Sequence, residues 1–135
     1  MEKLPKINII YEDNHLLVVE KPVNIPVQED ISKDIDMITL LKKYRIKKEN
    51  KKGDAYIGLV HRLDRPVGGI MVFAKTSKAA SRLSEEIRNN IFHKTYLAVI
   101  QGTMPKEGKL EDYLIKDNNK NISYIATKDK GKYSA

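Results

Sequence analysis

The sequence predicts an α+β fold, with a mixed or mainly antiparallel sheet and flanking helices. Short apolar or alternating runs, which are typical of strands, outnumber the two runs with helical spacing. Because some of these runs are joined by short turns and others by helices, we expect pairing through hairpins as well as crossovers. No repeat or linker divides the 135 residues, so the sequence predicts a single domain over residues 1–135.

The first elements predicted are a β-hairpin and an extended crossing. Residues 7–11 and 16–20 are apolar runs on either side of a polar turn at residues 12–15. Pro22 and Pro26 follow, and because proline fixes φ and lacks a backbone donor, we expect extended chain there.

Two segments have the spacing of helices. Residues 36–44 have apolar residues at helical spacing, with Asp36 as a plausible N-cap. A second helix is predicted to begin at Thr76-Ser77 and to run to about Asn89. One face of the second helix carries an apolar stripe that we expect to pack in the core. The stripe consists of Ala79, Ala80, Leu83 and Ile87. The lysine-rich residues 47–53 are expected to form a solvated loop.

The remaining apolar or alternating runs predict strands. They are residues 56–60, 70–74, 94–100, 109–115 and 122–127, before a tail with Lys128, Lys130 and Lys132. Alternation within residues 94–100 places Lys94 and Tyr96 on one face of their strand.

The most informative stretch is residues 61–69, His-Arg-Leu-Asp-Arg-Pro-Val-Gly-Gly, which joins two predicted strands. Asp64 lies between Arg62 and Arg65, and opposite charges within about 4–6 Å keep a carboxylate ionised. The proline after Arg65 disfavours helix, and the two glycines allow positive φ or close backbone approach. An ionised, oriented aspartate can act as nucleophile, base or metal ligand. From these residues alone, a surface ion pair that stabilises a turn is the better interpretation.

This stretch has companions on both sides in the chain. Residues 11–27 contain Tyr-Glu-Asp-Asn-His, an apolar strand, Glu-Lys-Pro and Ile-Pro-Val, and residues 92–102 contain Lys-Thr-Tyr followed by Ala and Gly. Together with residues 61–76, these segments resemble, in order, the motifs of the RluA-type RNA pseudouridine synthases. The resemblance covers about residues 7–102 and implies a pseudouridine synthase catalytic domain.

The resemblance implies a role for each site residue. Asp64 would be the catalytic carboxylate, which either adds covalently or removes a ribose proton to give a glycal. Arg62 would pair with Asp64 and orient it, and Arg65 would contact RNA phosphate or fill the space left by an extruded base. Tyr96 matches the family's active-site tyrosine and would stack on the flipped uracil. Without the resemblance, a core tyrosine is the better interpretation.

Two further residues, Lys94 and His61, are assigned to RNA contact by the same resemblance. A structural role is the alternative for both, and for His61 this is the satisfaction of a backbone group near the strand end.

Members of the family continue beyond the second motif with a third, Gly-Arg-x-His-Gln-Ile-Arg-like segment. This chain stops at Ala135 and has no histidine after His93. The resemblance therefore implies the N-terminal part of a catalytic domain, inactive by itself, with no separate RNA-binding domain before it. We expect the partner to be a locally recognised stem-loop in tRNA or rRNA.

Composition agrees with an RNA partner. The formal net charge is +7, from 25 Lys and Arg against 18 Asp and Glu, and the pI is near 9.5, which would also suit an anionic membrane surface. No apolar run approaches the ~18 residues of a spanning helix and no signal-peptide core is present, so we expect a cytoplasmic monomer. The absence of cysteine excludes disulfides, and three scattered histidines match no metal spacing. We expect no metal and no cofactor.

Two other classes of function stay open. A noncatalytic RNA-binding module would keep the scaffold without needing Asp64. A hydrolase using Asp64 would need a metal cluster or a second carboxylate, and Glu12, Asp13 and Asp112 have no spacing that indicates one.

Overall fold

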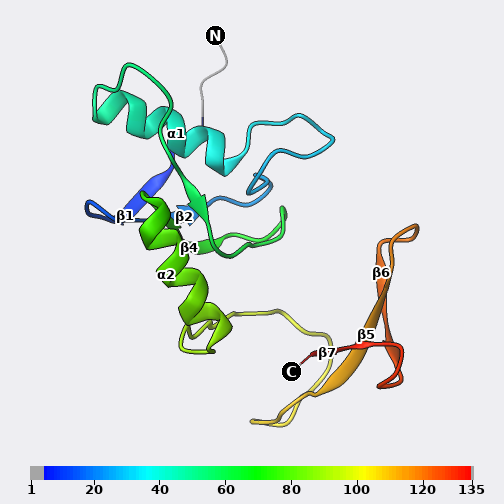
Figure 1. Cartoon of the computed structure of the whole chain (residues 1–135). Coiled ribbons are helices and arrows are strands. Elements are labelled where there is room, and N and C mark those ends of the chain that lie inside the picture. The colour runs from blue at the N-terminus through cyan, green and yellow to red at the C-terminus, as the bar shows by residue number, and fades with distance from the viewer. Residues whose placement is uncertain (1–4, 135) are drawn as a thin grey trace. The chain divides into compact units, whose positions relative to one another are not determined.

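The computed structural model describes residues 5–134, and the chain divides into two compact units, Met1–Thr95 and Tyr96–Ala135. The first unit has a four-stranded sheet of order β1-β2-β4-β3 with two helices, and the second has a three-stranded sheet of order β6-β5-β7 (Figure 1). The elements are β1 (Asn8–Glu12), β2 (Leu16–Lys21), α1 (Met37–Lys48), β3 (Gly58–Leu59), β4 (Gly69–Ala74), α2 (Ser77–Arg88), β5 (Asp112–Asp117), β6 (Ile122–Ala126) and β7 (Lys132–Ser134). Every strand pair is antiparallel, which confirms the predicted α+β class.

The predicted hairpin is confirmed, and the side chain of Asp13 closes its turn. One oxygen of Asp13, Oδ1, accepts from the backbone N–H groups of His15 at 2.7 Å and Leu16 at 2.6 Å. This is the local pairing that makes aspartate favourable in turns. β2 then pairs along its whole length with β4, from Leu16 opposite Ala74 to Lys21 opposite Gly69.

The two faces of the first sheet are covered by different helices (Figure 1). On one face Leu17, opposite Phe73, packs in the core with α1 residues Met37 and Leu41, all fully buried. On the other face α2 approaches β3 so closely that a Cβ added at Gly58 would lie 2.9 Å from the Cβ of Ala80. The period of two in a strand separates these faces and places alternate residues under α1 and α2.

Both predicted helices are confirmed at their caps. The side chain of Asp36 accepts from Thr39 N at 3.0 Å, and that of Thr76 accepts from Ala79 N at 3.2 Å. α1 continues beyond the expected end at Tyr44, because Arg45 is buried and donates to backbone oxygens outside the helix. The loop expected at residues 47–53 is therefore partly wrong, since its first two lysines belong to the last turn of α1.

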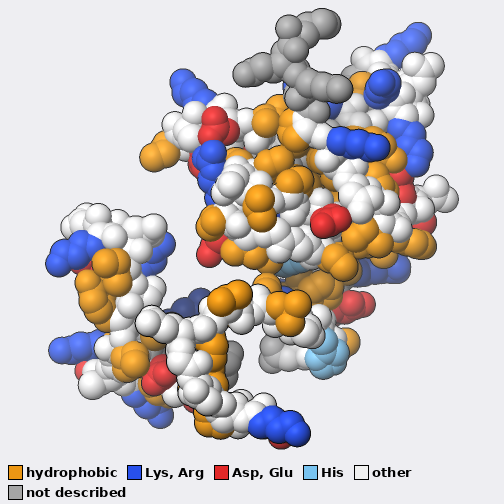
Figure 2. Space-filling view, turned by 180° about the vertical axis from the view of Figure 1, so that it is seen from behind, with side chains coloured by type: hydrophobic (Ala, Val, Ile, Leu, Met, Phe, Trp, Pro, Cys, Tyr) orange, Lys and Arg blue, Asp and Glu red, His pale blue; other side chains and the backbone are white. Residues whose placement is uncertain are grey.

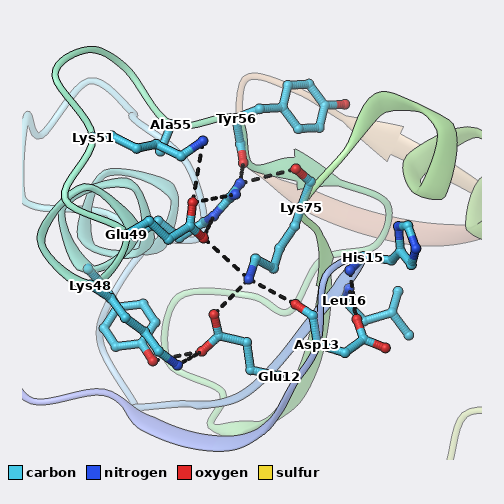
Figure 3. A network of polar contacts seen from close by, with 12 residues as sticks. Glu12, Asp13, His15, Leu16, Lys48, Glu49, Lys51, Ala55, Tyr56 and Lys75 are labelled. Atoms are coloured by element: carbon cyan, nitrogen blue, oxygen red, sulfur yellow. Dashed lines mark hydrogen bonds and ion pairs between the residues drawn. The ribbon is translucent and has the colours of Figure 1, made fainter.

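A network of charged groups joins β1, the end of α1 and the residue after β4 (Figure 3). Lys75 Nζ lies 2.8 Å from Glu12 Oε1 and 3.3 Å from Glu49 Oε1, while Lys48 and the Tyr44 hydroxyl bind Glu12 Oε2. Burial acts to raise the pKa of Glu12, but hydrogen bonds from these three neighbours outweigh it and lower that pKa to about 2. The network fixes the junction between β4 and α2.

Two strand predictions in the first unit and its border are corrected. Residues 56–60 form a strand only at Gly58–Leu59, because the carbonyl of Tyr56 accepts from Arg45 instead of a neighbouring strand. Residues 94–100 form no strand, and Leu97 and Val99 are fully exposed. Alternation is not sufficient for a strand when no neighbouring strand accepts its backbone hydrogen bonds.

The second unit is a three-stranded antiparallel sheet with β5 in the middle, and its first two strands match the predicted ones to within a few residues. The tail expected around Lys132 is corrected, because β7 pairs with β5 and places Tyr133 against Tyr113, ring centroids 5.7 Å apart. Several hydrophobic side chains of this unit are visible at its surface (Figure 2). Within the described residues 5–134, neither helix is long and apolar enough to cross a membrane.

Candidate active site

The stretch singled out in the sequence, residues 61–69, reaches from the end of β3 to the first residue of β4, and residues 61–68 form a loop called here the site loop. Its centre is a turn in which Val67 N donates to the carbonyl of Asp64 at 3.0 Å. Gly69 ends the loop with φ of +155°, a conformation that other residues rarely adopt. The positive φ predicted for one of the two glycines is therefore found at Gly69, the first residue of β4.

The site loop is fastened from inside by Lys21, the last residue of β2. This side chain is fully buried, and its Nζ donates to the carbonyls of Pro22 at 3.0 Å, Arg65 at 3.1 Å and Val67 at 2.6 Å. An ammonium has three donors, and three carbonyls satisfy all of them. The buried charge is thereby compensated, and two of its three acceptors belong to the site loop.

A second fastening comes from the segment after β2. Asn24, which has a positive φ of 64°, donates its N–H to the Arg65 carbonyl at 2.8 Å. Gly68 packs beside it, where an added Cβ would lie 3.2 Å from Val23 Cγ1 and 3.3 Å from the Lys21 carbonyl oxygen. The close backbone approach predicted for the two glycines is therefore found at Gly68, where the neighbours are Val23 and Lys21 of this chain.

The carboxylate of Asp64 is exposed and forms no hydrogen bond or ion pair with any of residues 5–134. The alternative of an ordinary ion pair that stabilises the turn therefore finds no support in the described part of the chain. Burial lowers the pKa of Lys21, and the charge of Asp64 opposes that shift, so the two groups are close enough to interact. The loop backbone is held while the carboxylate stays available.

The two arginines that flank Asp64 behave differently. Arg65 turns away from Asp64: its guanidinium forms an ion pair with Asp34 and donates to Ser32 Oγ at 3.1 Å. Arg62 is exposed and takes part in no ion pair within residues 5–134. In this state of the protein, the orientation of Asp64 by Arg62 stays a prediction.

His61 supports the sheet at the start of the site loop. Its Nε2 accepts from Val72 N at 3.0 Å, and its ring lies 5.4 Å from that of Phe92. Burial is the main cause that lowers the pKa of His61, and the charge of Lys94 adds to it. The imidazole therefore satisfies a backbone donor where β3 has already ended, as the alternative interpretation of this residue expected.

The second motif lies at the border between the two units. Lys94 is exposed in the first unit, whereas Tyr96 begins the second and is 59% exposed. Neither belongs to a strand, so their shared face is not formed. The proximity of Tyr96 to Asp64 stays a prediction.

Sequence reasoning missed Lys21 as part of this site, although a signal was present. The residue follows Leu17 and Val19 at the same phase of an alternating strand, and all three face the core. A lysine at a buried position of a strand needs acceptors that compensate its charge, and this phase distinguishes Lys21 from the exposed lysines of this chain.

The fold and the site describe an α+β protein in which a loop with a fastened backbone presents the Asp64 carboxylate, unpaired among residues 5–134. Such a carboxylate can act as a base or nucleophile toward a bound substrate. A family model described as RNA pseudouridylate synthase matches residues 15–135, and the chain belongs to this family. The pseudouridine synthases are isomerases that modify RNA.

Individual relatives agree with the family. An uncharacterized RNA pseudouridine synthase of Mycoplasma genitalium is 34% identical over 91% of this chain, and ribosomal large subunit pseudouridine synthase C of Buchnera aphidicola is 32% identical over 84%. Ribosomal large subunit pseudouridine synthase D of Xanthomonas campestris is 33% identical over 76%. Among solved structures, human RNA pseudouridylate synthase domain containing 4 is 26% identical with a TM-score of 0.54, covering 62% of this chain and 30% of that one.

The chain spans only part of these relatives. It covers 39%, 35% and 30% of the lengths of the three curated proteins, in the order given above.

Proposed function

We propose that the protein is an RNA pseudouridine synthase in which Asp64 is the catalytic carboxylate. The observation that carries the proposal is the contrast within the site loop: its backbone is fastened by Lys21 and Asn24, while the Asp64 carboxylate has no partner among residues 5–134. Asp13 and Asp36 use their side-chain oxygens to bind neighbouring backbone N–H groups, and Asp64 does not. A carboxylate left free on a rigid loop is suited to act on a substrate.

The reaction rearranges one nucleotide without adding or losing atoms. The bond between uracil nitrogen and ribose breaks, the base rotates, and a carbon of the base bonds to the ribose. Asp64 either adds covalently during this sequence or takes up a ribose proton and returns it. The site must exclude water while the base is detached, because water would otherwise compete for the reactive sugar.

The other site residues take supporting roles in the proposal. Arg62, whose guanidinium is free of ion pairs in residues 5–134, pairs with Asp64 when RNA is bound. Tyr96 stacks on the extruded uracil and Lys94 contacts the RNA backbone. His61 holds the entry of the site loop against β4.

The substrate proposed for this protein is an RNA that carries the target uridine. The family acts on RNA, and two of the relatives are named as ribosomal large subunit synthases, so we propose a uridine in rRNA as the first target to test. A tRNA stem-loop is the second. A uridine inside a paired or stacked RNA must be extruded at a cost of a few kcal/mol, which contacts from the basic surface would offset. We further propose that the protein is a cytoplasmic monomer.

The test uses the complete gene product, because the chain spans less than half of each relative. Wild type, Asp64→Asn and the control Glu85→Gln are incubated with total RNA from a strain that lacks the gene, and pseudouridine is mapped chemically. Glu85 is an exposed carboxylate of α2 with no ion pair in residues 5–134. We expect modification by wild type and the control and none by Asp64→Asn. Equal modification by all three would refute the assignment, and RNA binding without modification by any would favour a noncatalytic module.

A further inference from the structure

Residues 28–34, called here the acidic loop, lie against the guanidinium of Arg65. We propose that this loop is a latch that occupies Arg65 in the free protein and is displaced by an RNA phosphate when substrate binds. The proposal rests on the RNA-directed function above and adds a regulatory contact to the same site. The contacts with Arg65 come from three side chains of the acidic loop, the carboxylates of Asp30 and Asp34 and the hydroxyl of Ser32.

The latch contacts resemble the way a phosphate engages an arginine. Arg65 Nη2 pairs with Asp34, while Nη1 donates to Ser32 Oγ at 3.1 Å and lies 3.9 Å from Asp30 Oδ2. A guanidinium presents its donors as a planar fork that suits carboxylate or phosphate oxygens. The acidic loop therefore supplies the kind of oxygen ligands that an RNA backbone would supply.

The acidic loop is preorganised for this contact. Asp30 Oδ1 accepts from both the N–H and the hydroxyl of Ser32, at 2.9 and 2.5 Å, and Asp34 N donates to Ser32 Oγ at 3.2 Å. Hydrogen bonds from Ser32 lower the pKa of Asp30, and those from Arg65 lower the pKa of Asp34. Both carboxylates are charged at neutral pH and face the arginine together.

The same contacts are weak enough to exchange. The side chains of Arg65, Asp30 and Asp34 are 41%, 40% and 52% exposed, and ion pairs this exposed contribute little to stability because water and salt screen them. The pair between Lys75 and Glu12 is 8% and 9% exposed, and we expect it to stay closed. The difference in exposed fraction therefore predicts that the ion pair between Arg65 and Asp34 exchanges with solvent, whereas the ion pair between Lys75 and Glu12 does not.

Opening the latch would leave the site loop in place. Lys21 and Asn24 hold the Arg65 backbone carbonyl, whereas the acidic loop holds only the Arg65 side chain. The guanidinium can therefore change partners next to Asp64 without movement of the backbone that positions the carboxylate. Contacts that served only to hold the loop would not require that one set bind the Arg65 backbone and another set bind its side chain.

The test measures RNA affinity of the full chain with a uridine-containing rRNA stem-loop as probe, at fixed salt. The variants are Asp30→Asn with Asp34→Asn, the same pair combined with Arg65→Gln, Arg65→Gln alone, and a control in which Glu85→Gln and Glu86→Gln remove two carboxylates from α2. We expect the acidic-loop pair to tighten binding by roughly threefold to tenfold beyond the control, because a freed arginine no longer has to leave its partners. The gain should vanish when Arg65 is replaced.

Three outcomes would overturn the latch: weaker binding by the acidic-loop pair, a gain no larger than the control's, or a gain that persists without Arg65. Failure of wild type to bind the RNA would overturn both the latch and the RNA partner. If the expected affinities are found but no pseudouridine forms with the complete protein, the latch stands and the catalytic proposal fails. An NMR titration of the free chain checks the resting contact: Arg65→Gln should raise the pKa of Asp34, and an unchanged value would contradict the latch.

Discussion

The ammonium of Lys21 lies 2.6 Å from the carbonyl oxygen of Val67, across a sequence separation of 46 residues. This bond joins the end of β2 to the site loop and comes from a side chain that is fully buried. It makes the position of Asp64 depend on the hydrophobic core, because Lys21 shares its face of the sheet with Leu17 and Val19.

Replacement of Lys21 should therefore destabilise the fold. Lys21→Met fills similar space but leaves the carbonyls of Pro22 and Val67 without their donor, and the Arg65 carbonyl with only Asn24 N–H. We expect a loss of about 2 to 4 kcal/mol in the free energy of unfolding, measured in urea. Lys43→Met is the control, since Lys43 is exposed on α1 and pairs with no acid in residues 5–134. If both variants unfold at the same urea concentration as wild type, the cage does not contribute.

The charged network around Lys75 predicts loss of stability in acid. The pKa of Glu12 is about 2 in the folded chain against an ordinary 4.5, so the folded state binds fewer protons between these values. Its contribution is present above pH 4.5 and is lost as the pH falls through 2, about 3 kcal/mol in full, of which about 2 kcal/mol is lost by pH 3. Unfolding in urea at pH 7 and pH 3 measures it. Glu12→Gln should be less stable at pH 7 and less sensitive to acid, whereas Glu85→Gln should follow wild type.

His61 gives the fold a second, milder response to pH. Because its pKa is lowered in the folded chain, the unfolded state binds the proton more readily. Stability is therefore complete above the ordinary pKa of 6.5 and declines as the pH falls below it. Thermal unfolding between pH 7.5 and 5.5 should show the decline in wild type and less of it in His61→Gln, and an NMR titration should place His61 below 6.5. A titration at or above 6.5 would contradict the burial of the imidazole, which is the main cause of its lowered pKa.

Packing of α2 on β3 depends on the missing side chain of Gly58. Gly58→Ala would place its Cβ 2.9 Å from that of Ala80, and we expect a loss of about 1 to 3 kcal/mol from overpacking. Gly53→Ala is the matched control, because an added Cβ there meets no atom within 4 Å. Thermal unfolding compares the two. Equal midpoints would mean that α2 can shift away from β3 without cost.

Much of the first unit could be predicted because its signals are local. The hairpin turn at Asp13 and the helix caps at Asp36 and Thr76 each depend on residues two or three positions apart, and all three are confirmed. The site loop was recognised in the same way, from consecutive residues between two strands.

What the sequence did not reveal depends on distant residues. The carbonyls that bind Lys21 Nζ include two that lie 44 and 46 positions away, and the acidic loop meets Arg65 across 31 to 35 positions. No periodicity encodes such contacts. The wrong strand at residues 94–100 has the opposite cause: its pattern was regular, but a strand also needs a neighbour, and pattern alone does not supply one.

The cage around Lys21 also makes this residue a reporter of local motion. An amine-reactive reagent needs a free, uncharged amine, and the Lys21 amine is enclosed by the carbonyls of Pro22, Arg65 and Val67. Chemical labelling of this lysine must therefore wait until the site loop lifts from the sheet. The rate at which Lys21 is labelled, compared with that of exposed Lys43, gives the free energy of opening the loop that carries Asp64.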